Sequence, residues 1–236
     1  MSLRGGRMHP EEGGLLDFGV QLAKRAAFRW PLLRELSRPR YAYNLTPGEL
    51  SWLCTAISDT KDAGGYVVEV GCARGMTAAF LLTHMKSIAD ARPYICIDTF
   101  NGFVKRDVEF EVSERGKRRS WYRGFSYNDP AIFDANLRRL GHSNHRTVKA
   151  DAAEIDWASF ALIDVMLLDV DLYLPTKLVL AASCAFWSPT ARILVDDVVA
   201  SKAYDGAGAA VSEFCKERPF VMTPIGEKGG VISRRA

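Results

Sequence analysis

The stretch YVVEVGCARGMTAAFLL, which runs from Tyr66 to Leu82, decides the fold expected for this chain. It starts with a short apolar run rich in β-branched residues, continues through a turn that contains Gly71 and Gly75, and becomes helical near Met76. The two glycines let the backbone bend sharply and let a ligand approach without a Cβ in the way, and the helix start offers unpaired N–H groups. The stretch therefore predicts a strand, a tight loop and a helix that together hold a nucleotide-like ligand.

The residues of this loop also indicate which ligand it holds. Glu69 lies at the end of the strand, and Ala73 stands where the dinucleotide-binding fingerprint has its middle glycine. A carboxylate repels a diphosphate but attracts a sulfonium or an amino group beside a ribose. The loop therefore favours S-adenosylmethionine as cofactor, with Glu69, Gly71 and Gly75 in its binding site.

Composition and charge exclude several classes of protein. The 236 residues suffice for one α/β domain with a large core, since 48% are apolar and 25% are charged. A net charge of +3 is too small for a protein whose main partner is nucleic acid, and no run approaches the roughly 20 apolar residues of a membrane-spanning helix. The five cysteines are scattered without a Cys-x-x-Cys pair, as in proteins with reduced thiols. We therefore expect a cytoplasmic protein that binds neither nucleic acid nor membrane.

Three regions are expected along the chain. Residues 1–13 are polar and rich in glycine, which predicts a flexible tail. Residues 14–62 predict an N-terminal helical cap, with an amphipathic basic helix over residues 15–36 and a second helix that begins at the capping signature TPGE (46–49). The basic helix is expected to cover the domain or to join two chains in a homodimer, and binding to a membrane surface is the alternative. Residues 63–236 predict the main α/β domain.

Short β-branched runs alternate with helical patterns along the main domain, as in a parallel sheet covered by helices. The last two strand candidates are joined by a short glycine-rich turn, which predicts one antiparallel strand near the edge of the sheet. Strands are expected over residues 66–70, 94–98, 147–149, 162–169, 192–196, 220–223 and 231–233. The sequence thus predicts an α/β fold with a mostly parallel seven-stranded sheet and helices on both of its faces.

Residues 99–128 form a long segment without a clean period, with seven cations among acids and aromatic residues. Such a segment in a compact domain predicts a lid over the site, and a solvated surface excursion is the alternative. As a lid, its cations would suit an acidic or phosphorylated substrate, unless they only keep the loop soluble.

An acidic residue closes each of the five predicted parallel strands. The ligand of an open α/β sheet lies beyond the carboxyl ends of its strands, so these acids are expected at the site. Asp98 is expected to accept hydrogen bonds from ribose hydroxyls, and Asp151 is expected to lie near the adenine ring. The converging carboxylates of Asp169, Asp196 and Asp197 need a cation among them, and all-oxygen ligands favour Mg²⁺ over zinc. Such an ion would lower the pKa of an acceptor hydroxyl and hold it in line with a methyl group.

Five fragments of the chain resemble, in order and spacing, the macrocin O-methyltransferase family. They are Glu69-x-Gly71-x-x-x-Gly75, the run DTFNGF from Asp98, the run DVDLY from Asp169, Val195-Asp196-Asp197, and Gly208-x-x-x-Val211-x-x-Phe214. The resemblance extends from about residue 46 to the end, and it implies a Rossmann-like class I methyltransferase fold that uses S-adenosylmethionine and Mg²⁺. It also implies that Asp169, Asp196 and Asp197 hold the magnesium ion, that Asp169 is the catalytic base, and that the acceptor is a hydroxyl of a small molecule such as a sugar or natural product.

Two other interpretations stay open at the level of the sequence. An NAD-dependent oxidoreductase on a Rossmann-type sheet would need the full Gly-x-Gly-x-x-Gly turn, which this loop lacks. A cofactor-binding protein without catalysis is the second alternative, and the set of metal-binding acids argues against it.

Overall fold

The structure is a computed structural model that describes residues 15–31, 38, 40–199 and 202–235. The chain divides into two compact units, Met1–Ala42 and Tyr43–Ala236. The first unit contains the helix α1 (Leu15–Arg29). The tail expected over residues 1–13 lies outside the described residues.

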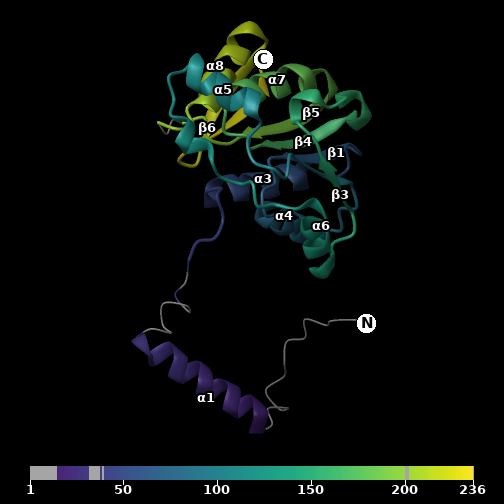
Figure 1. Cartoon of the computed structure of the whole chain (residues 1–236). Helices are drawn as coiled ribbons and strands as arrows, with labels where there is room; N and C mark the ends of the chain where they lie inside the picture. The colour runs from purple at the N-terminus through teal and green to yellow at the C-terminus, as the bar shows by residue number, and fades with distance from the viewer. Residues whose placement is uncertain (1–14, 32–37, 39, 200–201, 236) are drawn as a thin grey trace. The chain divides into compact units, whose positions relative to one another are not determined.

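The second unit is built on a seven-stranded sheet with the order β3-β2-β1-β4-β5-β7-β6 (Figure 1). Its strands are β1 (Tyr66–Val70), β2 (Tyr94–Asp98), β3 (His145–Lys149), β4 (Ile163–Leu168), β5 (Trp187–Val195), β6 (Phe220–Ile225) and β7 (Gly229–Arg234). The pairs β1–β2, β1–β4, β2–β3 and β4–β5 are parallel, and β7 runs antiparallel to both of its neighbours. The predicted fold, a mostly parallel α/β sheet with one antiparallel strand, is confirmed.

Helices cover both faces of this sheet, because its central strands are apolar on both sides. On β1, Val67 packs into the core of one face and Val68 into the core of the other. One face is covered by α3 (Pro47–Thr60), α4 (Met76–Ser87) and α6 (Pro130–Arg139), and the other by α7 (Tyr173–Ser183) and α8 (Gly206–Glu217) (Figure 1). No described helix combines the length and the apolar character that crossing a membrane requires.

The helix α3 begins at a capping box, as its sequence predicts. The N–H of Thr46 donates to Glu49 Oε2 at 2.7 Å, and the N–H of Glu49 donates to Thr46 Oγ1 at 3.4 Å. This exchange satisfies two donors that a helix start leaves without partners. α3 packs against β4 and β5 and belongs to the same unit as the sheet, whereas the chain divides after Ala42.

The segment over residues 99–128 is more regular than expected. It contains the helix α5 (Lys105–Ser113) and a 3₁₀ turn over Arg119–Tyr122. The buried face of α5 carries Asp107 and Glu111 beside a single apolar residue. Since a helical period is read from apolar residues, a helix that buries carboxylates shows no clean period in the sequence. The expectation of an irregular segment was therefore wrong over this part.

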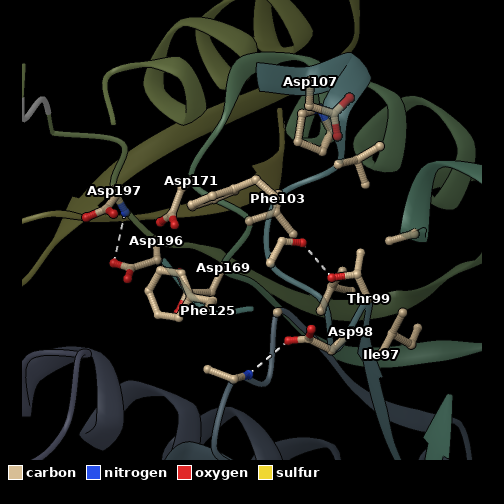
Figure 2. A pocket seen from close by; sticks show the side chains of 18 of the residues that line it. Ile97, Asp98, Thr99, Phe103, Asp107, Phe125, Asp169, Asp171, Asp196 and Asp197 are labelled. Atoms are coloured by element: carbon tan, nitrogen blue, oxygen red, sulfur yellow. Dashed lines mark hydrogen bonds between the residues drawn. The ribbon is translucent and has the colours of Figure 1, made fainter. Parts of the chain in front are cut away.

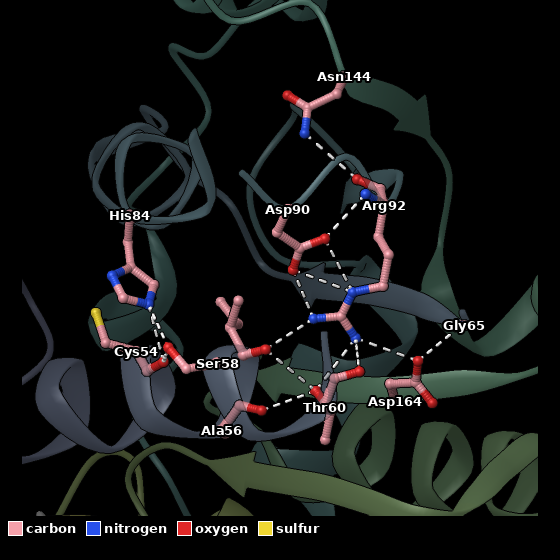
Figure 3. A network of polar contacts seen from close by, with 11 residues as sticks. Cys54, Ala56, Ser58, Thr60, Gly65, His84, Asp90, Arg92, Asn144 and Asp164 are labelled. Atoms are coloured by element: carbon pink, nitrogen blue, oxygen red, sulfur yellow. Dashed lines mark hydrogen bonds and ion pairs between the residues drawn. The ribbon is translucent and has the colours of Figure 1, made fainter. Parts of the chain in front are cut away.

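A buried arginine joins three elements at the amino ends of the strands, the edge of the sheet opposite to the predicted site (Figure 3). The Arg92 guanidinium contacts Asp90 Oδ2 at 2.7 Å and Asp164 Oδ2 at 3.2 Å, and it donates to carbonyl groups in the last turn of α3. Asp164 Oδ2 also accepts from the N–H of Gly65, just before β1, at 2.6 Å. The network thus ties α3, β1 and β4 together without using any residue at the carboxyl ends of the strands.

We expect Arg92→Met to lower the free energy of unfolding by about 3–5 kcal/mol, because it leaves Asp90 and Asp164 buried without a counterion. Urea denaturation followed by circular dichroism measures this loss. The matched control is Arg138→Met, which removes an exposed ion pair with Asp134 and should change the midpoint little. Equal midpoints for Arg92→Met and the control would contradict the role of the network.

Candidate active site

The strand register brings the predicted acids to one rim of the sheet. Leu168 of β4 pairs with Val70 of β1 and with Val195 of β5, so the residues that follow these strands leave the sheet side by side. Those residues are Gly71, Asp169 and Asp196. Asp98 ends β2, and Asp151 comes two residues after β3. The structure therefore places the acids in a row beyond the carboxyl ends of the parallel strands.

A cavity of about 540 Å³ opens along this rim (Figure 2). Figure 2 shows Asp171, Asp196 and Asp197 on one side of it and Asp98 on the other. The predicted site residues that line it are Gly71, Asp98, Asp151, Asp169, Asp196 and Asp197. The other two, Glu69 and Gly75, are not among its lining residues. Its volume is in the range of about 300–1,000 Å³ that is usual for small-molecule sites.

Gly71 is the point at which the glycine loop meets the carboxylates. It has φ +91°, and a Cβ built on it would lie 1.8 Å from the carbonyl oxygen of Asp169. The N–H of Asp169 donates to the carbonyl of Val70 at 2.8 Å, which holds the two chain segments in this approach. Both the backbone angle and the contact therefore require glycine at position 71.

Asp98 organises the glycine loop through its carboxylate. Its Oδ2 accepts from the N–H groups of Cys72 and Ala73 at 2.8 and 2.9 Å, and its Oδ1 accepts from the N–H of Phe100 at 2.7 Å. A carboxylate offers about four acceptor positions, so about one remains for a ligand. Asp98 thus holds the loop in shape and still presents one oxygen to the cavity.

Glu69 lies beneath the loop, inside the core. It is 2% exposed, and the hydroxyl of Tyr94 donates to its Oε2. Burial raises the pKa of Glu69 to about 8, and nearby Asp98 adds to the shift while the Tyr94 hydrogen bond opposes it. A neutral carboxyl is therefore present below this pH. Its predicted contact with the cofactor stays a prediction, and in this structure Glu69 supports the loop from below.

Gly75 also serves packing. It precedes α4 with φ +81°, and a Cβ at this position would lie 2.7 Å from the ring of Phe133 on α6. The glycine therefore lets α6 approach the start of α4, and its predicted part in cofactor binding stays untested.

Arg106 of α5 neutralises two acids on the cavity wall. Its guanidinium contacts Asp107 and Asp151, each at 2.9 Å. Burial raises the pKa of Asp107, although its contacts with Arg106 act in the opposite direction. Asp151 also accepts from the N–H of Ala153 at 3.0 Å, so it caps the short turn that follows β3.

The side of the cavity opposite to Asp98 carries a cluster of four carboxylates, which belong to Asp169, Asp171, Asp196 and Asp197. Burial, together with the neighbouring acids Asp196 and Asp171, raises the pKa of Asp169 well above its usual range. Burial and Asp197 raise the pKa of Asp196 to about 7. Asp171 and Asp197 have φ of +64° and +53°, a region that costs a residue with a side chain about 1–2 kcal/mol. Strain and crowded like charges in one place are typical of functional sites.

Lys228, in the turn between β6 and β7, supplies a cation to this cluster, and the sequence did not single it out. Its Nζ lies 2.5 Å from Asp196 Oδ2 and 3.2 Å from Asp197 Oδ1. Among the described residues that line the cavity, it is the only basic side chain, beside seven carboxylates. Its position between glycines in a turn gives no periodic signal that would mark it.

Two observations test whether the cluster fits a divalent cation. Its donors are all carboxylate oxygens, and they raise one another's pKa, which a cation among them would reverse. Lys228, however, already contacts two of them. Among the described residues, the only three ligand-type side chains whose donor atoms all lie within 4.8 Å of one another are Glu69, Cys72 and Cys96. The chemistry of the cluster fits a hard cation, whereas its spacing is that of a cluster paired with lysine.

The segment over residues 99–128 forms a wall of the cavity through Phe103, Val104, Asp107 and Phe125. Its cations do not extend into the cavity. Arg115 contacts Asp205 just before α8 at 2.7 Å, and Lys117 contacts the same carboxylate. These ion pairs attach the segment to the start of α8. They also neutralise the positive charges of Arg115 and Lys117, which were expected to attract an acidic substrate.

The fold is similar to those of solved methyltransferases. CalS11, a calicheamicin methyltransferase, has a TM-score of 0.63 at 17% identity, with 94% of this chain and 93% of that chain covered. The O-methyltransferase NovP has a TM-score of 0.63 at 18% identity, with 80% of each chain covered. Apo CalS11, described as a TDP-rhamnose 3'-O-methyltransferase, has a TM-score of 0.58 at 16% identity, with 94% and 95% covered.

No family model matches the sequence, and no curated protein matches it. At these identities the structural likeness establishes the fold, which is the Rossmann-like fold that these methyltransferases share. The resemblance to the macrocin family in particular is not confirmed.

We expect Gly71→Ala to destabilise the chain, because the new Cβ must displace the Asp169 carbonyl, and urea denaturation followed by circular dichroism measures the loss. Gly64→Ala is the matched control. Gly64 has φ +81° with no atom within 4 Å of its built Cβ, so that variant bears only the backbone cost of about 1–2 kcal/mol. Equal stability losses in the two variants would show that the contact at Gly71 is unimportant.

We expect Glu69→Gln to flatten the pH dependence of stability. The pKa of Glu69 is raised in the folded chain to about 8 from an ordinary value of 4.5, so the folded state binds more protons between these values. Stability then falls with rising pH by up to about 1.4 kcal/mol per unit, and the glutamine variant lacks this contribution. Urea denaturation at pH 5, 6 and 7 measures it, with the exposed Glu109→Gln as control. Parallel curves for wild type and Glu69→Gln would refute the prediction.

Proposed function

We propose that this protein transfers a methyl group from S-adenosylmethionine to a hydroxyl of a small molecule. The observation that carries the proposal is that a glycine loop with an acid-organised backbone and a cluster of carboxylates face one cavity of about 540 Å³. A methyl donor on one wall and a hydroxyl held at the other would meet within this space. Methyl transfer is a direct displacement, for which alignment of the two reactants is most of the work.

In this proposal the cofactor lies along the ends of β1, β2 and β3. Gly71 leaves room for it, Asp98 uses its remaining acceptor position for a ribose hydroxyl, and Asp151 lies near the adenine. The acidic wall suits the positive charges of the sulfonium and the amino group, since opposite charges at short range favour the charged forms of both partners.

The carboxylate side would hold the acceptor. Asp169, Asp196 and Asp197 are the residues that would bind Mg²⁺, whose positive charge would lower the pKa of the acceptor hydroxyl. Asp169 is the proposed general base. Burial and its acidic neighbours raise its pKa well above the usual range, which makes its carboxylate a stronger proton acceptor.

The acceptor is proposed to be an uncharged polyhydroxylated molecule such as a sugar. Two observations support this class. The sugar hydroxyl is supported by CalS11, which is described as a TDP-rhamnose 3'-O-methyltransferase, although the diphosphate of that acceptor is charged. The absence of charge is supported by the cavity wall. Among the described residues it carries seven carboxylates and one basic side chain, which disfavours an acceptor with its own negative charge.

Calorimetry with two variants tests the proposal. Wild type should bind S-adenosylhomocysteine and not NADH. Asp98→Asn should weaken that binding roughly 10- to 100-fold, because one carboxylate oxygen that accepts backbone N–H groups is lost. Asp196→Asn should bind it like wild type, but should produce no S-adenosylhomocysteine in turnover assays with a panel of neutral glycosides and S-adenosylmethionine.

Three results would contradict this proposal. Absence of heat with S-adenosylhomocysteine removes the cofactor assignment, and preferential binding of NADH favours an oxidoreductase. Equal loss of cofactor binding in both variants would contradict the division of the cavity into a cofactor side and an acceptor side.

A further inference from the structure

The turn that carries Lys228 is held in place on two sides. The carbonyl of Lys228 accepts from the N–H of Val199 at 3.0 Å. A Cβ built on Gly226 would lie 2.3 Å from Thr46 Oγ1, and one built on Gly229 would lie 2.2 Å from Glu49 Oε1. The turn therefore packs closely against the start of α3, and these contacts restrict the backbone at Lys228.

The side chain of Lys228 reaches from this fixed turn into the carboxylate cluster. Its Nζ contacts Asp196, whose side chain is 1% exposed, and Asp197, while its own side chain is 26% exposed. An ammonium group is a compact charge with three donors on a flexible stem, so its head can leave the cluster while the backbone stays in place. Because the side chain is partly exposed, the ammonium group has a path to solvent.

The position of this ammonium is unusual because it is the place that the proposed function gives to a metal ion. Asp196 Oδ2 and Asp197 Oδ1 are both proposed metal ligands and present contacts of Lys228. A divalent ion on these oxygens and an ammonium within hydrogen-bond distance of them would repel each other strongly in a partly buried site.

We propose that Lys228 is an internal counterion that occupies Asp196 and Asp197 when no divalent cation is bound and must withdraw before one can bind. The inference rests on the metal part of the proposed function. Lys228 offsets part of the negative charge of the cluster while no divalent cation is bound, and the same contact weakens the affinity of the cluster for such an ion.

A lysine that only supports the structure would have the opposite effect. Its removal would loosen the turn and the cluster and would lower metal affinity. Removal of a competing counterion raises metal affinity, so the sign of the change separates the two roles.

Calorimetric titration of the full chain with MgCl₂, without cofactor or acceptor, tests the inference. We expect Lys228→Met to bind Mg²⁺ at least about tenfold more tightly than wild type, and Lys228→Arg to bind it as weakly as wild type or more weakly. The matched control is Lys177→Met, which removes a 2.8 Å ion pair with Glu213 outside the cavity and should leave the affinity unchanged. Equal or weaker binding by Lys228→Met would overturn the inference and leave the metal site standing.

The failure of the proposed function gives a different result. If neither wild type nor Lys228→Met binds Mg²⁺ while both bind S-adenosylhomocysteine, the metal site and the counterion role fall together and the cofactor site stands.

A second measurement needs only the wild-type chain, in case Lys228→Met does not fold. Acetylation of Lys228 by an amine-reactive ester, followed by peptide mass spectrometry, should become several-fold faster when Mg²⁺ is added, because the ammonium is released from its carboxylates. The acetylation rate of Lys177 should not change. An unchanged rate at Lys228 with Mg²⁺ bound would overturn the inference.

Discussion

The close approach between Gly71 and the main-chain carbonyl of Asp169 is the constraint on which the site depends. Neighbouring strands lie about 4.8 Å apart, and the loops that leave β1 and β4 approach so closely that one of them can carry no side chain at the point of contact. Gly71 meets this condition, and the hydrogen bond from the Asp169 N–H to Val70 fixes the distance. The glycine loop and the carboxylate cluster consequently share one cavity wall, and every other residue of the site is placed relative to this junction.

The second organising feature is negative charge concentrated where water is scarce. Buried carboxylates are unfavourable unless they are paired, hydrogen-bonded or protonated, and the site uses each of these means at a different position. Backbone N–H groups hold Asp98, the guanidinium of Arg106 holds Asp151, and Lys228 holds Asp196. The charge of Lys228 also lowers the pKa of Asp169 and of Asp171, but burial and the neighbouring acids keep both pKa values well above their usual range.

The rule that ligands lie beyond the carboxyl ends of parallel strands was enough to predict which acids meet. It gave Asp98, Asp151, Asp169, Asp196 and Asp197, and all of them line the cavity. The rule could not predict where the side chain of Glu69 points. β1 is buried on both faces, so its sequence shows no alternation of apolar and polar residues that would distinguish the two faces. The sequence analysis also missed α5, because the buried side of this helix includes carboxylates. It missed Lys228 as well, because the contact of this side chain with the acids depends on where a turn with flanking glycines packs. Sequence patterns report backbone periods well and the reach of long side chains poorly.

The aromatic part of the cavity wall has a different origin from the acidic part. Phe103, Phe125 and Tyr204 belong to segments outside the sheet, and Arg115 and Asp205 attach these segments to each other. The acids belong to the strand ends, which the sheet register fixes. Replacement of an aromatic side chain would reshape the cavity without shifting a strand. Proteins built on this sheet can therefore differ in the molecules that the cavity admits while the row of acids at the strand ends stays the same.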